Sequence, residues 1–316
     1  MTRIHIANPA GDDPFAISQV QWDHAAARHG VAGHAVSFGA PPDDTEILIA
    51  PPGVLARMLP LNLPRLKMIF LTASGPDRLM PFTWLPSGVA LVNNRGVHGR
   101  KIGEYVAMAL LMLANQMPDY AAQQRARVWQ PHFSPVLRGR RLTVVGTGDL
   151  GSGAARQARH FGMLVTGVNT SGRSHPDFDR VVTGIDAVLP DSDFIVLACP
   201  LTEQTRDLLN ARRIGLLPAG AGLVNVGRGA LLDMSALCDR LDAGTLSGAV
   251  CDVFDPEPIA PDDRIWTTRN LVVTPHVAAD DPISYNAESL DLFFVNLAAW
   301  RAGTPLPNRV DLARGY

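Results

Sequence analysis

Short apolar runs alternate with longer amphipathic stretches along this chain, and the alternation predicts strands and helices in turn. In the first 95 residues, apolar runs typical of buried strands lie at residues 4–6, 47–50, 68–71 and 89–92. Because these runs are continuously apolar, we expect a parallel sheet that is covered on both faces.

A second alternation begins near residue 142. Its apolar runs lie at residues 142–145, 164–168, 194–198, 222–226, 248–253 and 271–274. Six strands with intervening helices predict a second doubly wound sheet.

Long helical patterns flank this second region at residues 102–117 and 283–301. The first pattern is apolar nearly all round, so we expect that helix to be buried between domains. The fold predicted is α/β, with two Rossmann-like doubly wound parallel-sheet domains. Because the first sheet precedes the second region and the last helix follows it, we expect the second domain to be inserted into the first. We predict a substrate domain from residues 1–98 and 281–316, and a dinucleotide-binding domain from residues 99–280.

The bulk composition narrows the class of protein. The 28 basic and 30 acidic residues give a net charge of −2, and no basic stripe with interleaved aromatic residues suggests a nucleic-acid partner. Charges or glycines interrupt the longest apolar stretches, so no membrane association is predicted. The three separated cysteines lie in apolar surroundings and the chain starts without a signal-like segment, which favours a cytoplasmic protein with reduced thiols. We predict no metal site.

A glycine loop, Gly146-Thr147-Gly148-Asp149-Leu150-Gly151, follows the strand-like run at 142–145 and precedes a helical run. In such a loop Gly146 permits the tight turn, Gly148 lets a pyrophosphate approach the backbone, and Gly151 lets the helix pack close to the sheet. The helix then presents free N–H groups to the phosphates. This context predicts a dinucleotide site. Asp149 is repulsive toward a pyrophosphate unless it points outward, and we interpret it as a helix N-terminal acid that complements the helix dipole.

The next strand ends without the Asp or Glu that usually holds the ribose 2′-hydroxyl of NAD. Asn169, Ser171 and Arg173 stand there instead. Asn169 does not repel a 2′-phosphate, Ser171 can donate a hydrogen bond, and Arg173 supplies positive charge. We therefore predict that NADP(H) is preferred and that NAD(H) is possible; the alternative is that Arg173 is only a solvated loop charge.

Three charged residues each follow a predicted strand in the second sheet: Arg228, Glu257 and His276. Ligands bind at the carboxyl edge of open α/β sheets, so we expect the three to converge there. An arginine holds an anion, an imidazole moves a proton, and a carboxylate favours the protonated imidazole. The set predicts hydride chemistry on a small keto acid.

These motifs resemble the D-isomer-specific 2-hydroxyacid dehydrogenase family over nearly the whole chain. The resemblance rests on the glycine loop, on residues 199–205, on Asn225-Val226-Gly227-Arg228-Gly229, on Asp255-Pro256-Glu257-Pro258, and on the early Ser74-Gly75-Pro76-Asp77. Within the family, residues 94–99, 103–105 and 315–316 look most like glyoxylate/hydroxypyruvate reductases.

The resemblance implies a role for each of these residues. Arg228 would grip the substrate carboxylate and polarise the keto oxygen, His276 would protonate that oxygen, and Glu257 would hydrogen-bond the imidazole. Ser74 and Gly75 would offer backbone N–H groups to the carboxylate, although Pro76 has none to give. Asp252 would meet the nicotinamide carboxamide or nearby backbone, or alternatively cap a turn. The residues predicted to bind the cofactor are Gly146, Gly148, Asp149, Leu150, Gly151, Asn169, Ser171, Arg173, Pro200, Thr205, Val226 and Asp252.

The predicted function is the NAD(P)H-dependent reduction of a small 2-keto acid, glyoxylate or hydroxypyruvate first, to the D-2-hydroxy acid. The alternatives are an NAD-linked dehydrogenase of another D-2-hydroxy acid and a dinucleotide-sensing scaffold. In proteins that this chain resembles, the arm that contains Trp129 embraces a second subunit, so we expect a homodimer with Trp129 near the partner's site.

Overall fold

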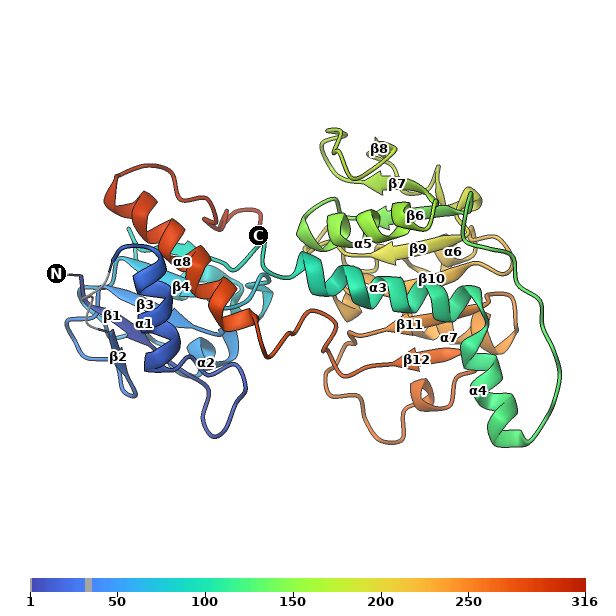
Figure 1. Ribbon diagram of the computed structural model, residues 1–316, viewed down its shortest axis with the longest axis horizontal. Helices are drawn as coiled ribbons and strands as arrows, with labels where there is room; N and C mark the ends of the chain where they lie inside the picture. The colour runs from blue at the N-terminus through green and yellow to red at the C-terminus, as the bar shows by residue number, and fades with distance from the viewer. Residues whose placement is uncertain (1, 32–35) are drawn as a thin grey trace. The chain divides into compact units, whose positions relative to one another are not determined.

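The computed structural model describes residues 2–31 and 36–316, which form two compact units (Figure 1). One unit contains the described residues up to Val97 together with Asp280–Tyr316, and the other is His98–Ala279. Both units contain an all-parallel sheet with helices packed on it, as the apolar runs predicted.

The first unit has a five-stranded sheet in the order β2-β1-β3-β4-β5. Its strands are β1 (Ile4–Ile6), β2 (Val36–Phe38), β3 (Ile47–Ala50), β4 (Met68–Leu71) and β5 (Ala90–Val92). Its helices are α1 (Gln19–Arg28), α2 (Pro52–Arg57) and α8 (Tyr285–Arg301). Trp22 of α1 packs against Phe293 and Phe294 of α8 in a core on one face of the sheet. Leu55 of α2 lies in a separate core on the other face, so the strands are covered on both sides.

The second unit has a seven-stranded sheet in the order β12-β11-β10-β9-β6-β7-β8. Its strands are β6 (Arg141–Val145), β7 (Leu164–Val168), β8 (Arg180–Val182), β9 (Phe194–Leu197), β10 (Gly222–Asn225), β11 (Gly248–Cys251) and β12 (Leu271–Val273). Its helices are α3 (Gly99–Ala114), α4 (Met117–Ala126), α5 (Asp149–His160), α6 (Ala211–Ile214) and α7 (Met234–Asp242). The strand order reverses between β6 and β9, and ligands of doubly wound sheets bind at such a reversal.

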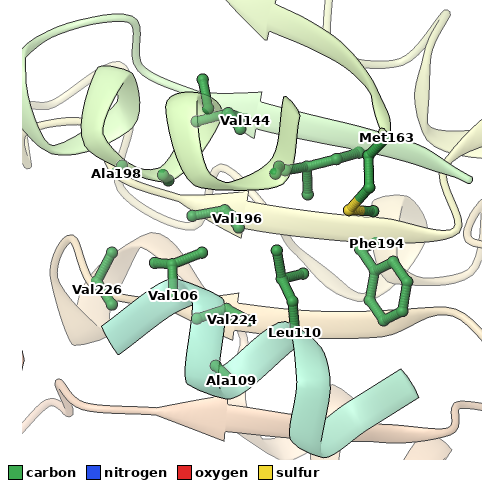
Figure 2. Close-up of a cluster of buried hydrophobic side chains, with 14 of the residues drawn as sticks. Val106, Ala109, Leu110, Val144, Met163, Phe194, Val196, Ala198, Val224 and Val226 are labelled. Carbon is green, nitrogen blue, oxygen red and sulfur yellow. The ribbon is translucent and has the colours of Figure 1, made fainter. Parts of the chain in front are cut away.

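Two cores cover the faces of this second sheet. On one face, Figure 2 shows Val106 and Leu110 of α3 among Val196 and Val224 of the central strands, and α5 packs into the same core. On the other face, Leu237 and the rest of α7 pack into the second core. The central strands are therefore buried on both sides, which explains their continuous apolar runs.

Three predictions about individual elements are wrong. Each sheet has one strand more than predicted, namely β2 and β8, which are partly exposed three-residue strands at the sheet edges. The helix predicted at 102–117 starts three residues earlier and ends at Ala114. It is also not buried all round, because Met108 and Leu111 are each 41% exposed while the opposite side packs on the sheet and α5. Within the described residues, no helix combines the length and apolar character needed to cross a membrane.

Candidate active site

The glycine loop connects β6 to α5 at the point where the strand order reverses. Gly146 has a φ of +101°, and a side chain there would meet the Ala198 carbonyl oxygen at 2.7 Å, so the loop lies against the end of β9. A side chain at Gly151 would collide with the carbonyl group of Gly146. These two glycines therefore allow the chain to fold, whereas Gly148 is exposed and a side chain there would meet no atom of the described residues within 4 Å.

This geometry fits a dinucleotide pyrophosphate. Gly148 is the N-cap of α5, and the N–H groups of the first helical turn lack carbonyl partners within their own helix. The open space next to Gly148 leaves these groups accessible, and the dipole of α5 favours an anion there. Leu150, in the first turn, is partly buried and packs against the core under α3.

The Asp149 carboxylate points away from this anion site. Its Oδ2 accepts hydrogen bonds from the backbone N–H groups of His98 (3.1 Å) and Gly99 (2.8 Å), at the start of α3. The acid therefore complements the dipole of α3 as well as that of its own helix. His98 is 6% exposed at this junction.

Asn169 folds the loop that follows β7. Its side-chain oxygen accepts hydrogen bonds from the N–H groups of Ser171 (3.1 Å) and Gly172 (2.7 Å), and its Nδ2 donates to the Thr147 hydroxyl (2.9 Å) in the glycine loop. Asn169 thus ties the two loops together. Ser171 and Arg173 are exposed, and the Arg173 guanidinium has no hydrogen bond or ion pair with any residue that the structure describes.

The turn after β9 is folded by Thr205. Its hydroxyl donates to the Pro200 carbonyl (2.7 Å) and accepts from the Thr202 N–H (2.7 Å). Pro200 is exposed and follows Ala198 and Cys199, whose backbone lies against Gly146 of the glycine loop. Val226, at the end of β10, is 4% exposed, and its N–H donates to the Leu197 carbonyl.

The Arg228 turn follows β10 and is organised by a fully buried asparagine. The Asn225 side chain accepts from the Gly227 N–H (3.1 Å) and donates to the Arg228 carbonyl (3.0 Å). A side chain at Gly229 would collide with the backbone of Phe254, so this turn lies directly against the segment that follows β11. Asn225 was not predicted to shape this turn, although an asparagine two residues before a Gly-Arg-Gly sequence is a typical turn-forming residue.

Glu257 forms hydrogen bonds to both the Phe254 backbone and the His276 side chain. One carboxylate oxygen of Glu257 accepts from the Phe254 N–H (3.0 Å), and the other lies 2.9 Å from Nδ1 of His276. The His276 side chain is 41% exposed and the Glu257 side chain 21%, so the imidazole is accessible while its partner is more covered. Because Nδ1 engages the carboxylate, Nε2 is the nitrogen left to meet a ligand.

His276 has a left-handed backbone, with a φ of +58°. A non-glycine residue in this region is uncommon, and such conformations concentrate at functional sites. Asp252 holds this turn: its backbone carbonyl accepts from the His276 N–H (2.8 Å), and its two carboxylate oxygens accept from Val277 N–H and Ala278 N–H (2.9 Å each). These contacts are the ones that the turn-capping interpretation of Asp252 requires, and its predicted contact with the nicotinamide carboxamide stays a prediction.

The structure thus places Arg228, Glu257 and His276 after β10, β11 and β12, three neighbouring strands whose carboxyl ends share one edge of the sheet. Ser74 and Gly75 lie in the other unit, just after β4, where the Ser74 hydroxyl donates to the Asn94 carbonyl (3.4 Å). Their predicted contact with a substrate carboxylate stays a prediction.

Together, the parallel sheet, the glycine loop and the buttressed His–Glu pair define a nucleotide-dependent oxidoreductase. Residues 107–278 match the family described as D-isomer specific 2-hydroxyacid dehydrogenase, NAD binding domain. This chain therefore belongs to the D-isomer-specific 2-hydroxyacid dehydrogenase family.

Three known proteins illustrate the similarity. Glyoxylate/hydroxypyruvate reductase A of Salmonella typhi is 28% identical, over 80% of this chain and 82% of that protein. The NADPH-dependent glyoxylate/hydroxypyruvate reductase of Sinorhizobium meliloti, in complex with NADP and sulfate, is 27% identical with a TM-score of 0.82. A D-isomer specific 2-hydroxyacid dehydrogenase of Xanthobacter autotrophicus, in complex with NADPH and MES, is 27% identical with a TM-score of 0.85. Both structural comparisons cover the whole of each chain.

Proposed function

We propose that this protein reduces a small 2-keto acid, glyoxylate or hydroxypyruvate first, to the D-2-hydroxy acid with NADPH as the preferred donor. The observation that carries the proposal is the 2.9 Å contact between His276 and Glu257 beside the Arg228 turn, in the same unit as the glycine loop. The names of the Salmonella typhi and Sinorhizobium meliloti relatives support this choice of substrates.

The division of labour follows from the chemistry of the side chains. A bound nicotinamide cofactor supplies the hydride. Arg228 offers a planar fork of donors, which suits a carboxylate and an adjacent keto oxygen. His276 donates its Nε2 proton to the keto oxygen as that oxygen gains charge, and Glu257 stabilises the imidazolium form before the transfer.

The direct test is a panel of 2-keto acids assayed with NADPH and NADH. We expect turnover of glyoxylate and hydroxypyruvate, with the higher kcat/KM for NADPH. A clear preference for NADH would favour an NAD-linked dehydrogenase of another D-2-hydroxy acid. The absence of turnover with every 2-keto acid would contradict the proposed activity.

Arg173 is proposed as the residue that recognises the 2′-phosphate of NADPH. Its guanidinium is exposed in the loop that the Asn169 side chain organises. We expect Arg173→Ala to lower kcat/KM for NADPH about tenfold, the loss of one charge-assisted contact of roughly 1.5 kcal/mol. NADH lacks this phosphate and is the internal control, so its kcat/KM should stay unchanged. An equal loss with both cofactors would contradict the assignment.

We also propose that the protein is a homodimer whose arm, residues 128–136, contacts the partner. Trp129 is 97% exposed, Phe133 94% and Val136 75%, and large aromatic residues dominate the binding energy of protein interfaces. Light scattering should give the mass of two chains, and the triple change of Trp129, Phe133 and Val136 to Ser should give one. A monomeric wild type would refute the proposal.

A further inference from the structure

Two hydrogen-bonded hydroxyl groups, one buried and one half-buried, lead from helix α3 to the turn that carries His276. The Tyr105 hydroxyl lies 2.6 Å from the Thr274 hydroxyl, which donates at 2.6 Å to Oδ1 of Asp252. Asp252 in turn holds the backbone of residues 276–278 with both carboxylate oxygens. All these residues belong to the same compact unit.

The direction of the hydrogen bonds is fixed by their end point. An ionised carboxylate only accepts hydrogen bonds, so the single proton of the Thr274 hydroxyl is donated to Asp252. Thr274 must then accept from Tyr105, and the phenol must be protonated. Burial raises the pKa of Tyr105 to about 12, so it remains a donor throughout the neutral range.

The turn needs such support because His276 has a left-handed backbone that L-residues other than glycine rarely adopt. A conformation of this kind persists only where the surroundings fix it. Asp252 is 2% exposed and Tyr105 is 8% exposed, so water has little access to replace a lost hydroxyl. Removing the Thr274 hydroxyl would leave the buried Tyr105 hydroxyl without its partner and would take from Oδ1 of Asp252 one of its two hydrogen bonds. Removing the Tyr105 hydroxyl would free the Thr274 hydroxyl to turn away from Asp252, so either change would loosen the hold on the turn.

Tyr105 places a hydroxyl group on a helix face that is otherwise apolar. Tyr105 lies on the face of α3 that buries Ile102, Val106 and Ala109 in the core. A phenylalanine would satisfy the packing of that face, so the hydroxyl serves the contact with Thr274 rather than the helix itself.

We propose that Tyr105 and Thr274 are positioning residues for His276: they orient Asp252, which fixes the left-handed turn and thereby aims the imidazole. This inference rests on the proposed function, in which His276 is the proton donor. Both act through Asp252.

The kinetic test compares four variants with glyoxylate and NADPH. Tyr105→Phe and Thr274→Val remove one hydroxyl each with little change of shape, and Thr274→Ser restores the hydroxyl. The matched control is Thr143→Val, because Thr143 is a buried threonine of β6 whose hydroxyl, among the residues that the structure describes, bonds the Ser192 hydroxyl alone, at 2.7 Å. We expect kcat to fall about tenfold or more in Thr274→Val and severalfold in Tyr105→Phe, as misplacement of a reacting group predicts. Thr274→Ser and Thr143→Val should stay within about twofold of the wild type, and the Kd of NADPH should be unchanged in all four.

A spectroscopic test does not depend on turnover. The imidazole signals of His276, assigned by their absence in His276→Asn, should shift in the NMR spectra of Tyr105→Phe and Thr274→Val but not in Thr143→Val. If these signals move while the wild type has no activity on any 2-keto acid, the positioning role stands and the proposed function fails. Unchanged signals and unchanged kcat in Tyr105→Phe would overturn the inference, as would equal losses in Thr274→Val and Thr143→Val.

Discussion

The His276→Asn variant should lose a factor of about 10² to 10⁴ in kcat, the usual contribution of a positioned general acid. Asparagine removes the imidazole but tolerates the left-handed backbone that His276 adopts, so the fold should survive. Steady-state kinetics with glyoxylate and NADPH measure the loss. Binding of NADPH, followed by its fluorescence, should remain, because the glycine loop is untouched.

His24→Ala provides the control for this variant, since His24 is an exposed residue of α1 in the other unit. Its kcat should equal that of the wild type. A His276→Asn enzyme with undiminished kcat would rule out the proton-donor role.

Gly148→Ala and Gly151→Ala should fail in opposite ways, although both change the same loop. A methyl group at Gly148 enters open space, so we expect an unchanged melting temperature and an NADPH Kd at least about tenfold higher, since the methyl group occupies the path of the pyrophosphate. A methyl group at Gly151 collides with the Gly146 carbonyl, so the free energy of unfolding should fall by about 1–3 kcal/mol.

Thermal unfolding and cofactor titration of the two variants separate these effects. Tight NADPH binding by Gly148→Ala would show that the pyrophosphate does not lie at this glycine. Full stability of Gly151→Ala would show that the helix and loop can separate without cost.

The sequence predicted the central strands well because they are buried on both faces. The limits of β1, β3 and β4 coincide with the apolar runs at 4–6, 47–50 and 68–71. The edge strands β2 and β8 were missed, since partly exposed strands of three residues carry no such run.

Features that depend on distant contacts could not be predicted. Helix α3 begins at Gly99 rather than near residue 102 because Asp149, fifty residues away, accepts hydrogen bonds at its N-terminus. The positions of Arg228, Glu257 and His276, each after a predicted strand, did indicate that they lie at one edge of the sheet. The contact between Glu257 and Nδ1 of His276, and the hydrogen bonds of Asn225 and Thr274, could be found only from the folded structure. No local pattern marks His276 as left-handed.

That left-handed histidine sets a trade-off for anyone who selects this protein for thermostability. Glycine or asparagine at position 276 would relieve backbone strain on the order of 1 kcal/mol, which makes the site attractive to a stability screen. The same substitutions would discard the imidazole. Under the role proposed for His276, stabilised variants chosen without an activity assay would therefore be enriched in inactive protein.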